Sequence, residues 1–277
     1  MEEYISDNSL YIRSKNNSMI NRKMIGRVLG MLLFIELGMF LLCAGVSAGY
    51  GESDYKYFLY TCIINAVVGG LLLLYGRGAE NKMSRRDGYC VVTLSWVFFT
   101  FFGMLPFYFS GSIDTITNAF FETMSGFTTT GATILDDIES LSHGMLFWRS
   151  LTQWIGGLGI VFFTIAILPI FTTGGVQLFS AESTGVTHDR THPKINVMAK
   201  WLWTIYLVLT VSETVLLMFG GMSLFDAICQ SFATTATGGY STKQNSISYW
   251  NSPYIEYVVA IFMIVSSINF SLFLMCL

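Results

Sequence analysis

Charged residues are scarce in this chain of 277 residues. Asp, Glu, Lys and Arg make up 12% of it, whereas soluble domains usually contain about 25%. The charges that are present cluster between long apolar stretches, and 53% of all residues are hydrophobic. This composition excludes a soluble globular domain and predicts an integral membrane protein. The sequence also lacks a basic patch with interleaved aromatic side chains, so it gives no support for nucleic-acid binding.

Motifs for metal, nucleotide and hydrolytic chemistry are missing as well. The five cysteines are scattered and form no CxxC pair, so neither a zinc site nor a disulfide framework is indicated. No GxGxxG or Walker-type phosphate loop is present. The three histidines fall outside the apolar runs, so an intramembrane hydrolase lacks its catalytic groups. The sequence therefore predicts a protein that is not an enzyme and binds no organic cofactor.

Six apolar runs approach the length of about 20 residues that crosses a bilayer as a helix. They are predicted over residues 24–48, 56–75, 89–109, 145–170, 199–220 and 254–277. Basic residues gather in 13–27, 77–86 and 190–200, whereas Lys56, Arg149 and Lys243 fall on the opposite side. Because basic loops stay in the cytoplasm, both termini are expected there.

Two shorter segments interrupt this pattern. Residues 113–126 and 224–235 span only about half a membrane as helices. Each leads into a stretch rich in Thr and Gly, 127–133 (FTTTGAT) and 234–241 (TTATGGYS). Such segments suit re-entrant half-helices, which are tolerated at membrane depth where protein or water surrounds them. The order span, half-helix, Thr-Gly stretch, span thus occurs twice, and it predicts a site where the two repeats meet.

The chemistry of a Thr-Gly stretch suits a cation. Glycine allows backbone angles that aim carbonyl groups into a common space, and rings of such carbonyls replace the water shell of K⁺ in selectivity filters. A half-helix that points its C-terminus at the same space adds partial negative charge. Two copies in matching contexts, with Thr130-Gly131 and Thr237-Gly238 spaced 107 residues apart, therefore predict a potassium pathway. The alternative is a pair of loops that only turn the chain.

At these residues the chain resembles the TrkH/KtrB family of potassium transporters, and its two additional N-terminal spans favour the TrkH branch. The resemblance also covers residues 154–160 (WIGGLGI), 222–227 (MSLFDA) and 251–253 (NSP). It implies an all-α membrane protein with two N-terminal transmembrane helices followed by two M1–P-loop–M2 potassium-channel-like repeats. It further implies that K⁺ is the transported ion, held by the backbone carbonyls of Thr129, Thr130, Gly131, Ala236, Thr237 and Gly238.

The resemblance also implies partners and a location. Family members are homodimers in the cell inner membrane and are gated by a cytosolic TrkA-like nucleotide-binding regulatory subunit. They contain four repeats, whereas this chain contains two, so we expect the N-terminal half of a pore. Either the chain is a fragment, or two half-chains assemble. A non-conducting membrane scaffold or regulatory half-subunit is the alternative function, and a secondary carrier of another fold is a third.

The predicted organisation has five parts: a cytoplasmic tail (1–23), the extra helix pair (24–88), the first repeat (89–170), a cytoplasmic connection (171–198) and the second repeat (199–277).

Four of the charged side chains within the predicted membrane segments have specific expectations. Glu122 either adds negative potential near the ion or ties the filter loop through a hydrogen bond. Glu36 and Glu213 are expected to pair with neighbouring helices, with a functional role as the alternative. Arg149 is expected to snorkel to the membrane surface.

Overall fold

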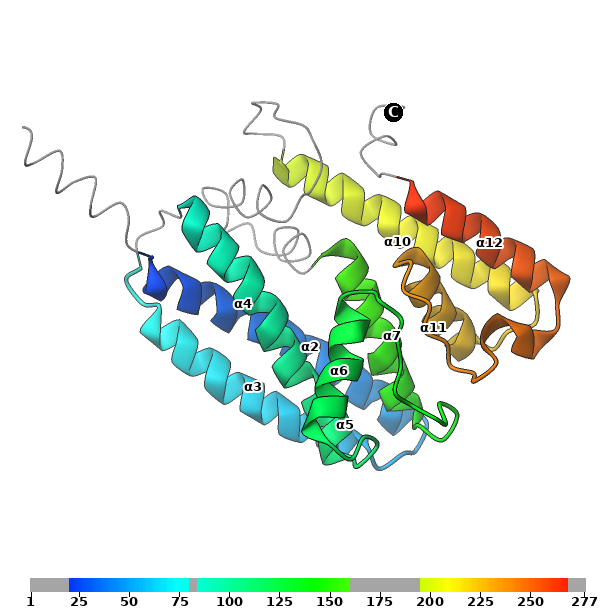
Figure 1. Cartoon of the computed structure of the whole chain (residues 1–277), viewed down its shortest axis with the longest axis horizontal. Coiled ribbons are helices and arrows are strands. Elements are labelled where there is room, and N and C mark those ends of the chain that lie inside the picture. Colours follow the sequence, from blue (N-terminus) through cyan, green and yellow to red (C-terminus); the bar gives the residue numbers. More distant parts are fainter. Residues whose placement is uncertain (1–19, 80–83, 160–194, 269–277) are drawn as a thin grey trace, which may run out of the picture.

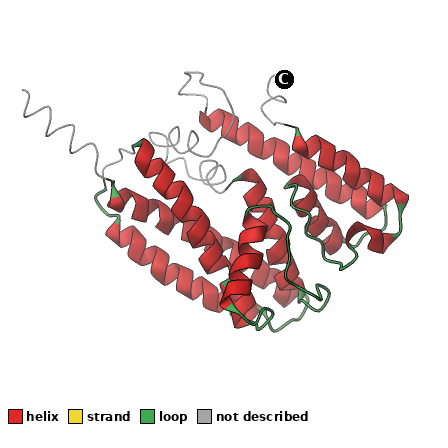
Figure 2. Ribbon diagram, in the orientation of Figure 1, coloured by secondary structure: helices red, strands yellow, loops and turns green. Residues whose placement is uncertain are grey.

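The computed structural model describes residues 20–79, 84–159 and 195–268, and every structural statement below concerns these residues. They form helices joined by loops, without a strand, as Figure 2 shows. The all-α prediction is therefore confirmed for this part of the chain.

The described part of the chain begins with two long helices that form a hairpin (Figure 1). α2 spans Arg22–Gly49 and α3 spans Tyr55–Tyr75. The helices approach closely at Gly30, where an added methyl carbon would lie 2.8 Å from the carbonyl oxygen of Gly69. Small residues at a crossing let membrane helices pack backbone against backbone. The hairpin is thus a tightly packed unit.

The next four helices differ in length. α4 spans Arg85–Gly103 and α5 spans Leu105–Phe109. Pro106 explains the break between them, because proline lacks the backbone donor and clashes with the preceding helical turn. The half-helix α6 spans Ile116–Phe127, and α7 spans His143–Leu158.

The C-terminal part has the same order of elements. α10 spans Ile195–Phe219, and the half-helix α11 spans Leu224–Thr235. A short 3-10 turn, η2 at Ser246–Trp250, then leads into α12 at Pro253–Ser267. α10 and α12 lie side by side, with α11 against both of them (Figure 1). A long helix, a half-helix, a loop and another helix therefore occur twice.

Four helices of the described ranges are long and apolar enough to cross a membrane: Arg22–Gly49, Tyr55–Tyr75, Arg86–Phe109 and Trp201–Phe219. α12 is apolar but shorter. Large apolar side chains stay exposed on the outer helices, among them Ile63, Val211 and Ile261. Such exposure is expected where lipid replaces water around a protein.

Two of the predicted boundaries that differ from the structure have a clear local cause. The sequence predicts one helix over 145–170, but α7 ends at Leu158, where Gly159 has a φ of 75°. Glycine adopts this left-handed conformation readily and so ends the helix. The first half-helix begins at Ile116 rather than at residue 113, because the Thr115 side chain caps it there. Residues 160–170, the connection before Ile195 and the end of the sixth predicted span lie outside the described chain.

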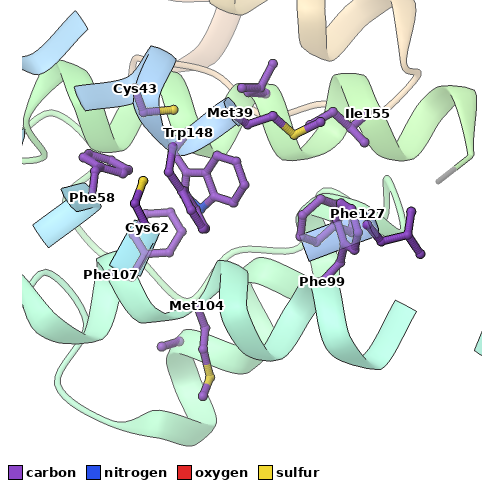
Figure 3. Packing of buried hydrophobic residues seen from close by; sticks show 14 of the residues in the cluster. Met39, Cys43, Phe58, Cys62, Phe99, Met104, Phe107, Phe127, Trp148 and Ile155 are labelled. Carbon is purple, nitrogen blue, oxygen red and sulfur yellow. The ribbon is translucent and has the colours of Figure 1, made fainter. Parts of the chain in front are cut away.

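The largest apolar core surrounds Trp148 on α7 (Figure 3). Its ring centroid lies 4.6 Å from that of Phe40 on α2 and 6.0 Å from that of Phe127 at the end of α6. The indole Nε1 donates a hydrogen bond of 2.9 Å to the carbonyl of Gly103. One side chain thus joins the N-terminal hairpin to the half-helix α6, and the two share a core.

Candidate ion-binding site

The half-helices α6 and α11 begin in the same way. Each starts after a hydroxyl residue whose side chain accepts a hydrogen bond from a backbone N–H three residues later. The donor to Thr115 is Asn118 at 3.2 Å, and the donor to Ser223 is Asp226 at 3.1 Å. Hydroxyl caps of this kind satisfy one of the backbone donors that a helix start leaves unpaired. Local sequence therefore determines where both half-helices begin.

The chain leaves both half-helices along the same backbone path. The Thr130 N–H donates back to the Ser125 carbonyl at 3.0 Å, and the Gly238 N–H donates back to Ala233 at 2.8 Å. In each copy a threonine has a positive φ angle, and so does the glycine two residues after it. The threonines are Thr129 (52°) and Thr237 (54°), and the glycines are Gly131 (75°) and Gly239 (86°).

This backbone match changes the register between the repeats by one residue. The Thr-Gly pairs in the sequence align Gly131 with Gly238, whereas the structure aligns Gly131 with Gly239. Ala236 corresponds to Thr128, since each is the C-cap of its half-helix. The second stretch contains two adjacent glycines, and the one with positive φ is the structural equivalent. The Thr-Gly dipeptide in the sequence instead selects Gly238.

The two Thr-Gly stretches lie against each other. A methyl group on Gly131 would overlap the carbonyl oxygen of Gly238. The structure therefore brings together the two glycines that the sequence analysis selected, from stretches that are far apart in the chain. Several residues of the two stretches are exposed: Thr128, Thr130, Ala132, Thr133, Thr237 and Gly239. Of the other predicted site residues, Thr129 and Gly131 are partly exposed, whereas Ala236 and Gly238 are buried.

Behind the first stretch lies a buried ion pair. Arg149 Nε donates to Glu122 Oε1 at 2.8 Å, and the two side chains are 2% and 0% exposed. Glu122 also accepts hydrogen bonds from Thr133 Oγ1 at 2.9 Å and from the Ile134 N–H at 3.0 Å. Of the two roles considered for Glu122, the structure shows the hydrogen bonds that tie the loop. The snorkelling predicted for Arg149 is wrong, because a buried carboxylate neutralises the guanidinium within the protein.

Arg149 also reaches the second stretch. One of its terminal nitrogens donates to the Ser241 carbonyl at 3.0 Å, and its guanidinium lies 3.6 Å from the centroid of the Tyr240 ring. The Tyr240 hydroxyl donates to the Glu122 carbonyl at 2.9 Å and lies 3.3 Å from the Ala132 carbonyl. The planar guanidinium suits this task, since it can stack on a ring and donate at its edge simultaneously.

Gln153, one turn further along α7, contacts the second stretch directly. Its Oε1 accepts a hydrogen bond of 3.0 Å from the Tyr240 N–H. Its carboxamide lies flat against Gly238, where an added methyl carbon would be 2.5 Å from the same oxygen. Sequence reasoning missed both Gln153 and Tyr240. A sequence signal was available for Gln153. It stands four residues after Arg149, and this spacing places two polar side chains on the same side of an apolar helix.

The Gly156-Gly157 pair places α7 against both half-helices. A methyl group on Gly156 would overlap the carbonyl oxygen of Phe127, at the end of α6. A methyl carbon on Gly157 would lie 2.7 Å from the Cα of Ala236, at the end of α11. Close approach of this kind requires residues without a side chain. α7 therefore contacts the C-terminal ends of both half-helices as well as both Thr-Gly stretches.

Glu36 and Glu213, the two other carboxyl groups that the sequence analysis considered, both lie against neighbouring helices. Glu36 accepts a hydrogen bond of 3.0 Å from Asn65 Nδ2 on α3, and Glu213 lies 3.4 Å from the Thr235 hydroxyl on α11. The expected pairing with neighbouring helices is therefore confirmed. Within the described ranges no group of three or more His, Cys, Asp and Glu side chains is placed to hold a metal ion. A metal site at His188 and His192, which stand four residues apart in the sequence, would lie outside those ranges.

These observations define a class: an all-helical membrane protein in which two half-helices end in neighbouring Thr-Gly stretches. The chain belongs to the TrkH family, described as cation transport proteins, because residues 55–277 match the model of that family. It is 42% identical to the Trk system potassium uptake protein TrkH of Escherichia coli K12 over 250 residues, which cover 90% of this chain and 52% of that protein. It is 37% identical to the TrkH of Halomonas elongata over 252 residues, with the same two coverages.

A solved structure supports the same assignment. The crystal structure of the potassium transporter TrkH from Vibrio parahaemolyticus matches with a TM-score of 0.77 and 35% sequence identity. The match covers 92% of this chain and 51% of that one. The chain thus spans about half the length of the relatives it matches. Their names are those of transporters, in agreement with the prediction of a non-enzymatic protein.

Proposed function

We propose that this chain forms half of the pore of a Trk-type potassium uptake protein. One observation carries the proposal: two Thr-Gly stretches with the same backbone conformation contact each other at Gly131 and Gly238. Each stretch offers backbone carbonyls that can replace the water shell of K⁺. The names of the relatives, which are potassium uptake proteins, support the choice of ion.

The proposed ligands are backbone carbonyls of the two stretches. They comprise those expected from the sequence, Thr129, Thr130, Gly131, Ala236, Thr237 and Gly238, and the register of the structure adds Gly239 as the equivalent of Gly131. The C-terminal ends of α6 and α11 point the negative ends of their dipoles toward the same region. The backbone carbonyls and the helix dipoles both favour a cation, so no charged side chain is needed at the site.

Two strands of backbone supply only part of the oxygens that a dehydrated ion needs. We therefore propose that further filter strands complete the pore, from additional repeats in a longer polypeptide or from a second copy of this chain. The proposed pore lies in the cell inner membrane with the basic ends of the helices in the cytoplasm. Potassium would enter down the membrane potential, which is worth about 2.3 kcal/mol per charge per 100 mV. A homodimer and a TrkA-like regulatory subunit belong to the same proposal.

A non-conducting scaffold or regulatory half-subunit is the second candidate. It is favoured by the length of the chain, which covers only 52% of the Escherichia coli relative. In this case the chain would fold, insert and bind partner subunits without a complete ion path.

Rubidium uptake separates the two candidates. The purified chain is reconstituted into liposomes, alone and joined in frame to the remaining half of the Escherichia coli TrkH. Both proteins are also expressed in cells that lack their own potassium uptake and are grown at low potassium. Flux and growth from either form support the proposed function. Growth and flux from neither form, with both inserted in the membrane, would reject it in favour of the scaffold.

A further inference from the structure

The two Thr-Gly stretches contact each other at Gly131 and Gly238 and through the Tyr240 hydroxyl, which lies 3.3 Å from the Ala132 carbonyl. The polar side chains of α7 bond the second stretch directly and reach the first through Glu122. Among the described residues no backbone hydrogen bond joins 127–135 to 234–242. Each stretch bonds backward to its own half-helix instead, through Thr130 and Gly238. The separation of the two stretches therefore depends on the side chains around them, which come from α7, from Glu122 of α6 and from Tyr240 of the second stretch itself.

Two residues of α7 provide this support. Arg149 bonds the Ser241 carbonyl of the second stretch and, through Glu122, the Thr133 hydroxyl and Ile134 N–H of the first. Gln153 bonds the Tyr240 N–H and lies against the Gly238 backbone. Arg149 thus connects the two stretches, and Gln153 holds the second one where its Gly238 carbonyl meets Gly131.

The amide nitrogen of Gln153 costs stability rather than adding it. Gln153 is fully buried, and no hydrogen-bond partner for its Nε2 is found among the described residues. A buried donor without a partner costs about 1–3 kcal/mol. A residue whose only task was to stabilise the fold would not need this amide, so its value lies in the oxygen that meets Tyr240.

We propose that Arg149 and Gln153 are positioning residues that set the separation of the two Thr-Gly stretches, and that this separation determines the preference for K⁺ over Na⁺. The inference rests on the proposed function, because it assigns to α7 the spacing of the proposed filter carbonyls. K⁺ and Na⁺ differ in size and in the number and field strength of the oxygens they prefer. A shift of one stretch relative to the other therefore changes the binding of K⁺ and the binding of Na⁺ by different amounts.

Two substitutions at Gln153 separate positioning from stability. Gln153→Met keeps the volume, removes the acceptor for Tyr240 and removes the unpaired donor. We expect little change in thermal stability and a fall of about fivefold to tenfold in the rubidium-to-sodium flux ratio, the effect of one lost hydrogen bond. Gln153→Glu keeps the acceptor and should restore the ratio to within about twofold.

Arg149→Lys tests the connection between the stretches. Lysine keeps the charge beside Glu122 but lacks the fork that reaches Glu122 and Ser241 together. The flux ratio should fall here as well, while uptake of rubidium persists. Leu151→Met, a volume-conserving change in the apolar core of the same helix, is the control and should leave the ratio unchanged.

The measurement uses the forms from the uptake experiment, with sodium and rubidium flux and thermal unfolding recorded for each variant. A reduced ratio in Gln153→Met that Gln153→Glu restores supports the inference. If the wild type conducts and its ratio survives both Gln153→Met and Arg149→Lys, the inference is overturned and the proposed function stands. If no wild-type form conducts, the proposed function fails and the inference with it.

Discussion

The two Thr-Gly stretches share a backbone but differ in what supports them. The first is largely exposed, and a carboxylate from its own half-helix, Glu122, ties it back. The second is mostly buried and is held from another part of the chain, by Arg149 and Gln153 of α7. The position in α11 that corresponds to Glu122 is Gln230, which is neutral and bonds the Thr234 hydroxyl at 3.3 Å. One backbone conformation is thus maintained by a carboxylate of its own half-helix in one repeat and by side chains of α7 in the other.

This difference teaches that the repeats are not interchangeable units. The carboxylate of Glu122 needs a buried cation, and Arg149 of α7 supplies it. Gln230 carries no charge and needs no such partner. The following predictions test the comparison, from the largest expected effect to the smallest.

Gly131→Ala should have the largest effect on transport. The new methyl group overlaps the Gly238 carbonyl oxygen, and the positive φ alone costs about 1–2 kcal/mol for a residue with a side chain. Rubidium uptake should be lost. Gly45→Ala on α2, where an added methyl carbon meets nothing within 4 Å, is the control. Full uptake by Gly131→Ala would show that the contact between Gly131 and Gly238 is not part of the transport site.

Glu122→Leu should destabilise the protein far more than Gln230→Leu. It leaves Arg149 buried without its carboxylate, which costs about 3–5 kcal/mol, whereas Gln230→Leu removes a neutral contact worth about 1 kcal/mol. Thermal unfolding in detergent measures both. Glu122→Leu combined with Arg149→Met should recover much of the loss, because no unpaired charge remains. Equal losses for Glu122→Leu and Gln230→Leu would contradict the proposed difference in support.

Tyr240→Phe should have a smaller effect. It removes the hydroxyl that donates to the Glu122 carbonyl, the cross-link between the second stretch and α6, and we expect a loss of about 1 kcal/mol. The ring that stacks on Arg149 remains. Tyr249→Phe, an exposed position on η2, provides the matched control, and unfolding of both variants is compared. A Tyr240 variant as stable as this control would show that the cross-link contributes nothing.

The smallest expected effect concerns pH and the far end of α7. Burial raises the pKa of Glu52, but hydrogen bonds from the His143 and Gly144 N–H groups and from the His143 ring outweigh it, so the pKa is lowered. A lowered folded pKa means that this stabilisation is fully present above the unfolded pKa of about 4.3 and is lost as pH falls through the folded pKa. Glu52→Gln should flatten the dependence of thermal stability on pH in that acidic range. A pH dependence in Glu52→Gln as steep as in the wild type would contradict this assignment.

Much of the fold was predictable because the signals are local. The predicted second half-helix, 224–235, agrees with α11 at both ends, since a serine cap starts it and the Thr-Gly stretch follows. The first half-helix, α6, begins three residues later than predicted, at a threonine cap that the sequence analysis did not use. The end of α7 at Leu158 depends on the backbone of Gly159, and an apolar run that continues beyond it conceals such a break.

The candidate site was predictable only in part. Gly131 and Gly238 were selected from composition and repetition, and they do meet. The register between the stretches was off by one residue, because a Thr-Gly dipeptide is a weaker guide than the order of positive φ angles. Arg149 was assigned to the membrane surface because its carboxylate partner lies 27 residues away in the chain, on another helix.

The sequence by itself determined that this is a helical membrane protein with two half-helices, each followed by a Thr-Gly stretch. Apolar length, hydroxyl caps and glycine act within a few residues, so they can be recognised without coordinates. Only the tertiary structure decided that α7 lies behind both stretches and that Arg149, Gln153 and Tyr240 connect them. A buried polar side chain must find its partner through space, and neither helix periodicity nor composition records which distant residue that partner is.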